Sequence, residues 1–184
     1  VGSEMCIRDR VTVVERGGVA CAASGKSGGF LARDWCDGSP LGPLARASFA
    51  LHRELAATLP DDCGYRPVDT WLVESGQGDR PAAQRTLTPW LDGEGRLRGL
   101  IGDCESTAQV HPERFTRALM DEAVRAGATL RSGVVQGLSL SGSDSHTRCQ
   151  GAIVDGELVE ADAVVLAMGP WTGMLEGNLP IPPI

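Results

Sequence analysis

Long apolar runs are missing from this 184-residue sequence, since none approaches the roughly 20 residues that a membrane-spanning helix requires. Clusters of Lys and Arg are missing too, and the net charge of −7 argues against a surface that binds nucleic-acid phosphates. The first residues hold no apolar segment of the kind found in a signal peptide. With 42% hydrophobic and 22% charged residues, the composition predicts a soluble globular protein long enough for one full domain.

Patterns typical of metal sites and of residue-borne catalysis are also missing. The cysteines include no C-x-x-C pair, and no histidine lies close enough to complete a zinc pattern. We therefore expect no metal site, and thiols in a reducing compartment, which favours the cytoplasm. No Ser-His-Asp set or paired carboxylates can be placed, so the catalytic residues stay unknown, and His52 and His111 are expected to have structural, capping or surface roles. The six cysteines are Cys6, Cys21, Cys36, Cys63, Cys104 and Cys149.

The segment VTVVERGGVACAASGKSGGF holds the strongest pattern in the chain. Its β-branched run Val11–Val14 predicts a short buried parallel strand, and this run stops at an acid, Glu15. An acid at that end of a nucleotide-binding βαβ unit accepts hydrogen bonds from the ribose hydroxyls of an adenine nucleotide. The loop Ala23–Gly29 is rich in glycine and serine, and glycine lets backbone N–H groups approach phosphate or ring oxygens.

Further elements follow from periodicity and turn signals. A helix that Pro60 ends is predicted by residues that recur every three or four positions and mark its apolar face: Leu44, Ser48, Leu51, Leu55 and Leu59. The segment Tyr65–Glu74 is expected to form one strand followed by a turn. A second helix is expected to begin at Pro112, with Phe115, Leu119 and Ala123 as its buried stripe and Gly127 as its C-terminal cap.

The last third of the chain predicts more strands. They are expected at 128–131, at Val134-Val135, and in a hairpin whose strands 151–154 and 157–159 are joined by a type I′ turn at Asp155-Gly156. The uninterrupted apolar run Ala163–Ala167 is typical of a strand at the centre of a parallel sheet covered on both faces. It leads directly into the segment MGPWT at 168–172.

Taken in order, these segments resemble the FAD-dependent oxidoreductases of the D-amino-acid oxidase and glycine oxidase type. In that family a VTVVER-like strand precedes a loop similar to SGKSGGFLARDW, and an A-x-G-P-W-[ST] segment forms a second dinucleotide-contacting loop. The segment VHPERFTRALMDEAVRAGATLRSGVV resembles the family's helix-then-strand element. The resemblance runs from about Val11 to the end of the chain. It implies an α/β, Rossmann-like FAD/NAD(P)-binding fold, truncated, with part of a mixed β-sheet substrate domain.

The resemblance also implies FAD as the cofactor, with Glu15 at the adenosine ribose, the glycine-rich loop along pyrophosphate and flavin, and Val134-Val135 beside the adenine. Lys26 is left open between a counter-charge for the pyrophosphate and a solvated lysine. The implied cofactor-binding residues are Glu15, Arg16, Ser24, Gly25, Ser27, Gly28, Gly29, Phe30, Val134, Val135, Ala167, Gly169 and Trp171.

The sequence is expected to be a fragment. A flavin fold should have a first strand and a G-x-G-x-x-G turn before the acid-ended strand, and both are missing. Residues 1–10 fit no periodicity and resemble a non-native lead-in, while the proline-rich residues 179–184 end where the family continues. The expected division is a lead-in at 1–10, FAD-binding parts at 11–60 and 107–178, a substrate-domain part at 61–106, and a truncated tail at 179–184.

The leading hypothesis is an FAD-dependent oxidoreductase that oxidises a small amine or amino acid by hydride transfer to flavin, although the fragment alone is expected to be inactive. One alternative is a nicotinamide-dependent dehydrogenase, which uses the same strand and acid. The other is a non-catalytic nucleotide-binding or trafficking regulator with the same fold. The sequence indicates neither the substrate, nor the electron acceptor, nor the oligomeric state.

Overall fold

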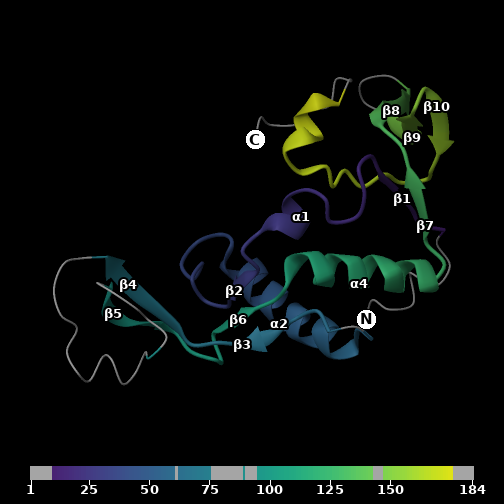
Figure 1. The fold of residues 1–184 in the computed structure, drawn as a ribbon. Coiled ribbons are helices and arrows are strands. Elements are labelled where there is room, and N and C mark those ends of the chain that lie inside the picture. The colour runs from purple at the N-terminus through teal and green to yellow at the C-terminus, as the bar shows by residue number, and fades with distance from the viewer. Residues whose placement is uncertain (1–9, 61, 76–88, 90–94, 143–146, 176–184) are drawn as a thin grey trace. The chain divides into compact units, whose positions relative to one another are not determined.

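The computed structural model describes residues 10–60, 62–75, 89, 95–142 and 147–175 (Figure 1). Contacts divide the chain into two compact units. We call residues 1–26 together with 119–184 the N/C unit, and residues 27–118 the middle unit. Each unit combines strands with helical segments, so the protein is of the α/β class that the sequence predicts.

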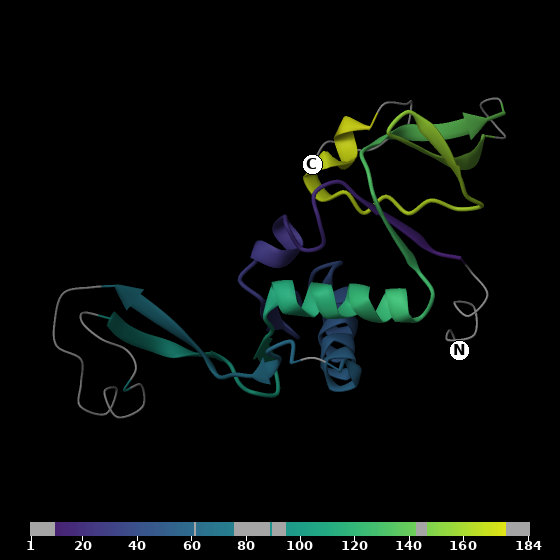
Figure 2. The same cartoon turned by 45° about the vertical axis from the view of Figure 1, so that its right-hand side comes forward.

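The N/C unit contains a parallel pair of strands, β1 (Thr12–Glu15) and β7 (Thr129–Ser132) (Figure 2). Their register places Val13 opposite Leu130 and Glu15 opposite Ser132. Both strands lie within one residue of their predicted positions, because the β-branched residues of β1 suit a pleated sheet and β7 directly follows the end of a helix. The expected burial of β1 is wrong, since Val11 is 49% exposed and no residue of β1 is buried. The pairing joins segments more than a hundred residues apart and fixes where Glu15 lies.

A three-stranded antiparallel sheet follows in the same unit. It consists of β8 (Val135–Ser141), β9 (Arg148–Val154) and β10 (Glu157–Glu160) in the order β10-β9-β8. The turn between β9 and β10 has positive φ angles at Asp155 (52°) and Gly156 (84°), as a type I′ turn requires. The predicted Asp-Gly hairpin is therefore confirmed.

The middle unit surrounds a small core beside the sheet β2-β6-β3, formed by β2 (Phe30–Ala32), β6 (Thr107–Gln109) and β3 (Arg66–Pro67). Strands β4 (Thr70–Ser75) and β5 (Gly95–Gly102) form a separate antiparallel ribbon. Helix α2 (Gly42–Thr58) buries Phe49. Its His52 stacks on Phe115 with ring centroids 5.0 Å apart and bonds the Ser48 carbonyl through Nδ1, which is a structural role.

Helix α4 (Pro112–Arg125) is capped as the sequence predicts, but its predicted buried stripe is only partly correct. Phe115 and Ala118 are buried, whereas Leu119 and Ala123 are half-buried. At its start, His111 Nδ1 accepts the Arg114 N–H at 3.4 Å, so this histidine caps the helix. At its end, Gly127 has a φ of 105°, and the N–H groups of Gly127 and Ala128 donate to the carbonyls of Val124 and Ala123. These two bonds form a Schellman motif and satisfy carbonyls that the helix itself leaves unpaired.

Three expectations about local structure are wrong. Tyr65–Glu74 is not one strand, because Val68 and Asp69 separate β3 from β4. The first residues of the glycine-rich loop form one helical turn, α1 (Ala23–Lys26), closed by bonds to the Ala22 carbonyl. In α2, Leu44 (66% exposed) and Leu51 (52% exposed) face outward, since Phe49 is the side chain that meets the core.

The largest difference concerns residues 163–167, which the sequence predicts as a central strand. They are not in a strand, and Val165 is 87% exposed. Because a strand exists only through hydrogen bonds to a neighbour, a suitable apolar run without one stays irregular. No described strand pairs with this run. The chain then enters the 3-10 helix η1 (Gly169–Met174). Among the described residues, no helix combines the length and the apolar character needed to cross a bilayer.

Candidate functional site

Two hydrogen bonds hold Glu15 at the end of β1, one accepted by its carboxylate and one accepted by its backbone carbonyl. Carboxylate Oε1 accepts the Gly17 N–H at 2.9 Å, and the backbone carbonyl accepts the Gly133 N–H at 3.2 Å. The half-buried carboxylate is therefore directed toward the loop that follows β1. The bond from Gly17 uses only Oε1, so Oε2 is the oxygen that could accept a hydrogen bond from a ligand hydroxyl.

Arg16 and Trp171, both predicted to bind the cofactor, contact each other. The guanidinium carbon of Arg16 lies 4.6 Å from the centroid of the Trp171 ring. This cation–π contact connects the residue after β1 with η1, although the two lie more than 150 positions apart in the sequence. The sequence indicates both residues but not their contact.

The three loop glycines differ in what surrounds them. A Cβ at Gly25 would lie 1.9 Å from the Ala20 carbonyl oxygen, and one at Gly29 would lie 2.0 Å from the Val110 carbonyl oxygen. Both positions are therefore restricted to glycine by packing within the protein. A Cβ at Gly28 would meet nothing within 4 Å, so of the three only Gly28 offers the open approach that a ligand needs.

Val134 and Val135 differ in whether their backbone N–H and C=O groups are hydrogen-bonded to the next strand and its turn. The Val134 N–H donates to Asp155 Oδ1 at 3.0 Å, and the Val134 carbonyl accepts the Asp155 N–H at 3.1 Å. Val135 pairs with Val154 in the next, non-hydrogen-bonded position of the β8–β9 ladder. Among the described strands β8 is at the edge of this sheet, so the N–H and C=O of Val135 point away from β9 toward that edge.

The predicted cofactor-binding residues divide between the two units. Phe30 is 42% exposed, and its ring lies 5.0 Å from that of Trp35 at a tilt of 44°. Gly169 has a φ of 55° and open space at its Cβ position. In the N/C unit lie Glu15, Arg16, Ser24, Gly25, Val134, Val135, Ala167, Gly169 and Trp171. In the middle unit lie Ser27, Gly28, Gly29 and Phe30.

Two residues of this region were missed by the sequence reasoning. Ala20 adopts a left-handed backbone (φ 62°), and its carbonyl is the one that packs against Gly25. Asp155 was interpreted only as a turn residue, although its carboxylate binds the Val134 peptide. The Asp-Gly turn signal identified its backbone conformation but carried no information about its side-chain partner.

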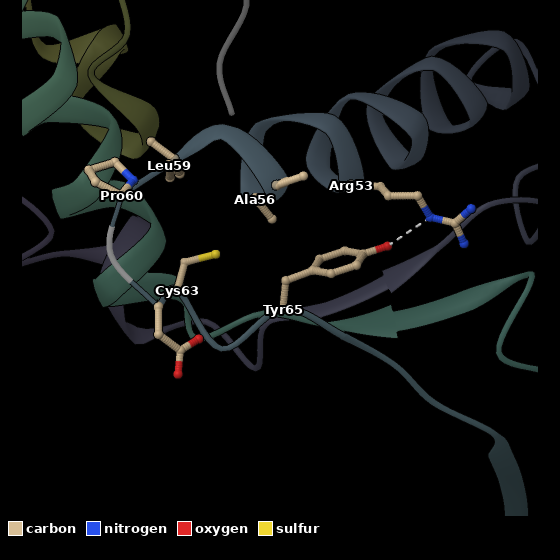
Figure 3. Close-up of a pocket in the computed structure, with 8 residues that line it drawn as sticks. Arg53, Ala56, Leu59, Pro60, Cys63 and Tyr65 are labelled. Atoms are coloured by element: carbon tan, nitrogen blue, oxygen red, sulfur yellow. Dashed lines mark hydrogen bonds between the residues drawn. The ribbon is translucent and has the colours of Figure 1, made fainter.

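The middle unit has a separate hollow of about 350 Å³ between the end of α2 and residues 62–65 (Figure 3). Arg53 Nε donates to the Tyr65 hydroxyl at 3.5 Å, and this bond is the main cause that raises the pKa of Arg53 above its ordinary value. The Asp62 carboxylate accepts the Gly64 N–H at 2.8 Å. The polar side chains thus bind one another or the backbone, and we assign the hollow no ligand. It is lined by Arg53, Ala56, Ala57, Leu59, Pro60, Asp62, Cys63 and Tyr65.

Comparison with known proteins identifies the family. The family model described as "FAD dependent oxidoreductase" matches residues 6–184. A Schizosaccharomyces pombe protein that is named as an oxidoreductase is 33% identical over 195 residues, which cover 95% of this chain and 50% of that protein.

Within the described residues, no group of three His, Cys, Asp or Glu side chains could hold a metal ion.

Solved structures share the fold. Glycine oxidase from Bacillus cereus superposes with a TM-score of 0.70 at 21% identity, covering 90% of this chain and 52% of that one. L-amino acid deaminase from Proteus myxofaciens superposes with a TM-score of 0.66 at 18% identity, covering 88% of this chain and 40% of that one. This chain spans about half the length of the relatives it matches. It belongs to the family of FAD-dependent oxidoreductases.

Proposed function

We propose that the whole protein binds FAD without a covalent link and oxidises a small amine or amino acid. One observation carries the proposal: the Glu15 carbonyl accepts the Gly133 N–H, which places the acid at the end of β1 beside the chain leading to Val135. The N/C unit therefore holds both a carboxylate oxygen that can accept hydrogen bonds from ribose hydroxyls and a backbone edge that can bind a nucleobase.

The residues present fit an adenine dinucleotide. Glu15 Oε2 would accept bonds from the ribose hydroxyls, and the outward N–H and C=O of Val135 match the acceptor and donor on the amino edge of adenine. In the N/C unit, the open space at Gly169 would allow backbone to approach the cofactor closely. Arg16 would keep Trp171 and η1 beside Glu15 through the cation–π contact.

Bound FAD would supply the oxidant, taking a hydride from the C–H bond next to the substrate nitrogen. The tasks left to this chain are to bind the cofactor and to keep its adenosine end in place. The names of the structural neighbours, a glycine oxidase and an L-amino acid deaminase, support a small amine or amino acid as substrate. We also infer that residues 11–60 and 107–178 form the cofactor-binding part and 61–106 a part of the substrate domain.

The absorbance spectrum of the purified whole protein tests the proposal. We expect oxidised-flavin bands that bleach without oxygen when glycine or another small amino acid or amine is added. A colourless protein that cannot be reconstituted with FAD would contradict it. Glu15→Gln should weaken FAD binding about tenfold, because the neutral amide has one accepting oxygen in place of two charged ones and cannot accept both the Gly17 N–H and a ribose hydroxyl. Glu160→Gln, an exposed acid of the same unit, is the matched control and should leave the affinity unchanged.

Residues 1–184 alone should be inactive. Among the described strands the β1–β7 pair has no further neighbour, and a sheet of two strands is marginally stable by itself. We expect the isolated chain to bind FAD weakly and to self-associate, which size-exclusion chromatography would reveal. A monomeric 184-residue chain that retains one FAD per molecule would disprove this.

A further inference from the structure

We propose that Asp155 is a positioning residue for the nucleobase subsite, a role that rests on the proposed function. Its carboxylate accepts the Val134 N–H through Oδ1 at 3.0 Å, while its own N–H donates to the Val134 carbonyl at 3.1 Å. Both backbone groups of Val134 are thereby occupied. The next residue, Val135, is left to offer an N–H and a C=O at the open edge of β8.

The turn that carries Asp155 also holds the residue on the other side of Val135. The Gly156 N–H donates to Gln136 Oε1 at 2.7 Å. The residues before and after Val135 are therefore both bound to one two-residue turn, Val134 through its backbone and Gln136 through its side chain. An edge fixed before the ligand arrives loses less conformational entropy on binding.

The Asp155 carboxylate also packs closely against Gly133, between β7 and β8. A Cβ at Gly133 would lie 2.7 Å from Asp155 Oδ2 and 2.7 Å from Val154 Cγ1. The same glycine donates its N–H to the Glu15 carbonyl. The carboxylate of Asp155 is thus packed against the segment that connects the ribose-binding acid with the nucleobase edge, so its loss should be felt at the nucleobase.

Two substitutions separate the carboxylate's role from that of the backbone conformation. Asp155 has a φ of 52°, a conformation that both asparagine and glycine tolerate. Asp155→Asn retains an oxygen that can accept the Val134 N–H, whereas Asp155→Gly removes it. A difference between these two variants therefore reports the hydrogen bond and not backbone strain.

The experiment compares the affinity of the whole protein for FAD with that for 1,N6-etheno-FAD, whose ethene bridge blocks the amino edge of adenine. We expect the wild-type protein to prefer FAD, Asp155→Gly to lose about tenfold in FAD affinity with little change for the etheno analogue, and Asp155→Asn to keep the preference within about twofold. A purely structural role would weaken both ligands equally in Asp155→Gly.

Three results would overturn the inference while leaving the proposed function standing. Equal affinities of the glycine and asparagine variants for FAD would exclude the carboxylate bond. Equal weakening of FAD and the etheno analogue in Asp155→Gly would reduce Asp155 to a structural residue. If wild-type protein bound both dinucleotides equally, the backbone edge at Val135 would play no part in binding the nucleobase. FAD binding, and hence the proposed function, would still stand. Failure of wild-type protein to bind FAD at all would instead refute the proposed function together with this inference.

Discussion

The guanidinium of Arg16 lies 4.6 Å from the centroid of the Trp171 ring. Arg16 follows β1, whereas Trp171 belongs to η1 near the other end of the described chain. Residues 163–168, which lead into η1, are in no helix or strand, and β1 pairs only with β7 among the described strands. The contact is therefore a specific side-chain connection between these two parts of the N/C unit.

A double-mutant cycle should measure this connection. Arg16→Gln removes the charge and Trp171→Leu removes the ring, so the coupling free energy isolates their interaction. We expect a coupling of about 0.5–1 kcal/mol in the free energy of unfolding, the range for an exposed cation–π pair. Urea denaturation of the four proteins at one salt concentration gives the value. Strictly additive effects would show that the two side chains do not stabilise each other.

The loop glycines give a second prediction, with its control in the same loop. Gly25→Ala places a Cβ 1.9 Å from a backbone oxygen and should lower the free energy of unfolding by about 1–3 kcal/mol. Gly28→Ala meets no atom within 4 Å and should change stability by less than about 0.5 kcal/mol. In the whole protein, however, we expect Gly28→Ala to weaken FAD binding because it fills the open approach.

Thermal melts measure the stability of both variants, and FAD titrations of the whole protein measure their affinity for the cofactor. The proposed place of Gly28 at the cofactor would be wrong if Gly28→Ala bound FAD as tightly as wild-type protein. A stable Gly25→Ala variant would show that the Ala20 carbonyl moves away at little cost.

The accuracy of the sequence predictions follows the range of the interactions involved. Helix α4 and the β9–β10 hairpin were predicted closely, because their caps and turn depend on neighbours such as Gly127 and Gly156. The strand expected at 163–167 depends on a partner that no local pattern reveals. In α2, the spacing of Leu44 and Leu51 predicts a helix correctly but not its buried face, which only tertiary packing decides.

The candidate site follows the same rule. The acid after β1 is visible in the sequence because it has a fixed place relative to one strand. The bond between Asp155 and Val134 spans twenty-one positions and depends on how β9 pairs with β8. The tight position of Gly29 likewise depends on Val110, far along the chain. Glycine in a loop can thus reflect internal packing as readily as ligand approach.

A third prediction concerns Ala20, whose φ of 62° is unfavourable for a residue with a Cβ. Ala20→Gly should raise the free energy of unfolding by about 1 kcal/mol, because relief of this strain exceeds the entropy that glycine adds to the unfolded chain. Ala50→Gly, on the exposed face of α2, should have the opposite effect and lower it by about 1 kcal/mol. Chemical denaturation of the two variants gives opposite signs if the left-handed conformation at Ala20 is correct.

The last prediction concerns the carboxylate of Asp103, just after β5. Its Oδ1 accepts the Ser106 hydroxyl at 2.8 Å, and the N–H groups of Ser106 and Glu105 at 3.0 and 3.1 Å. Chiefly through the hydroxyl bond, these donors hold the pKa of Asp103 below its ordinary value of 3.8. Because the folded pKa is the lower one, the stabilisation is complete above pH 3.8 and is lost as the pH falls through the folded pKa.

Ser106→Ala should therefore raise the pKa of Asp103 toward its ordinary value and remove part of that acid-sensitive stability. A pH titration of the side-chain carboxyl carbons by NMR measures the shift directly. Asp37 provides the internal control, because a hydrogen bond from Arg46 is the main cause that lowers its pKa, and this bond does not involve Ser106. If Asp103 titrated at the same pH in both proteins, the two backbone N–H groups would be sufficient to hold the carboxylate, and the hydroxyl would contribute nothing to its pKa.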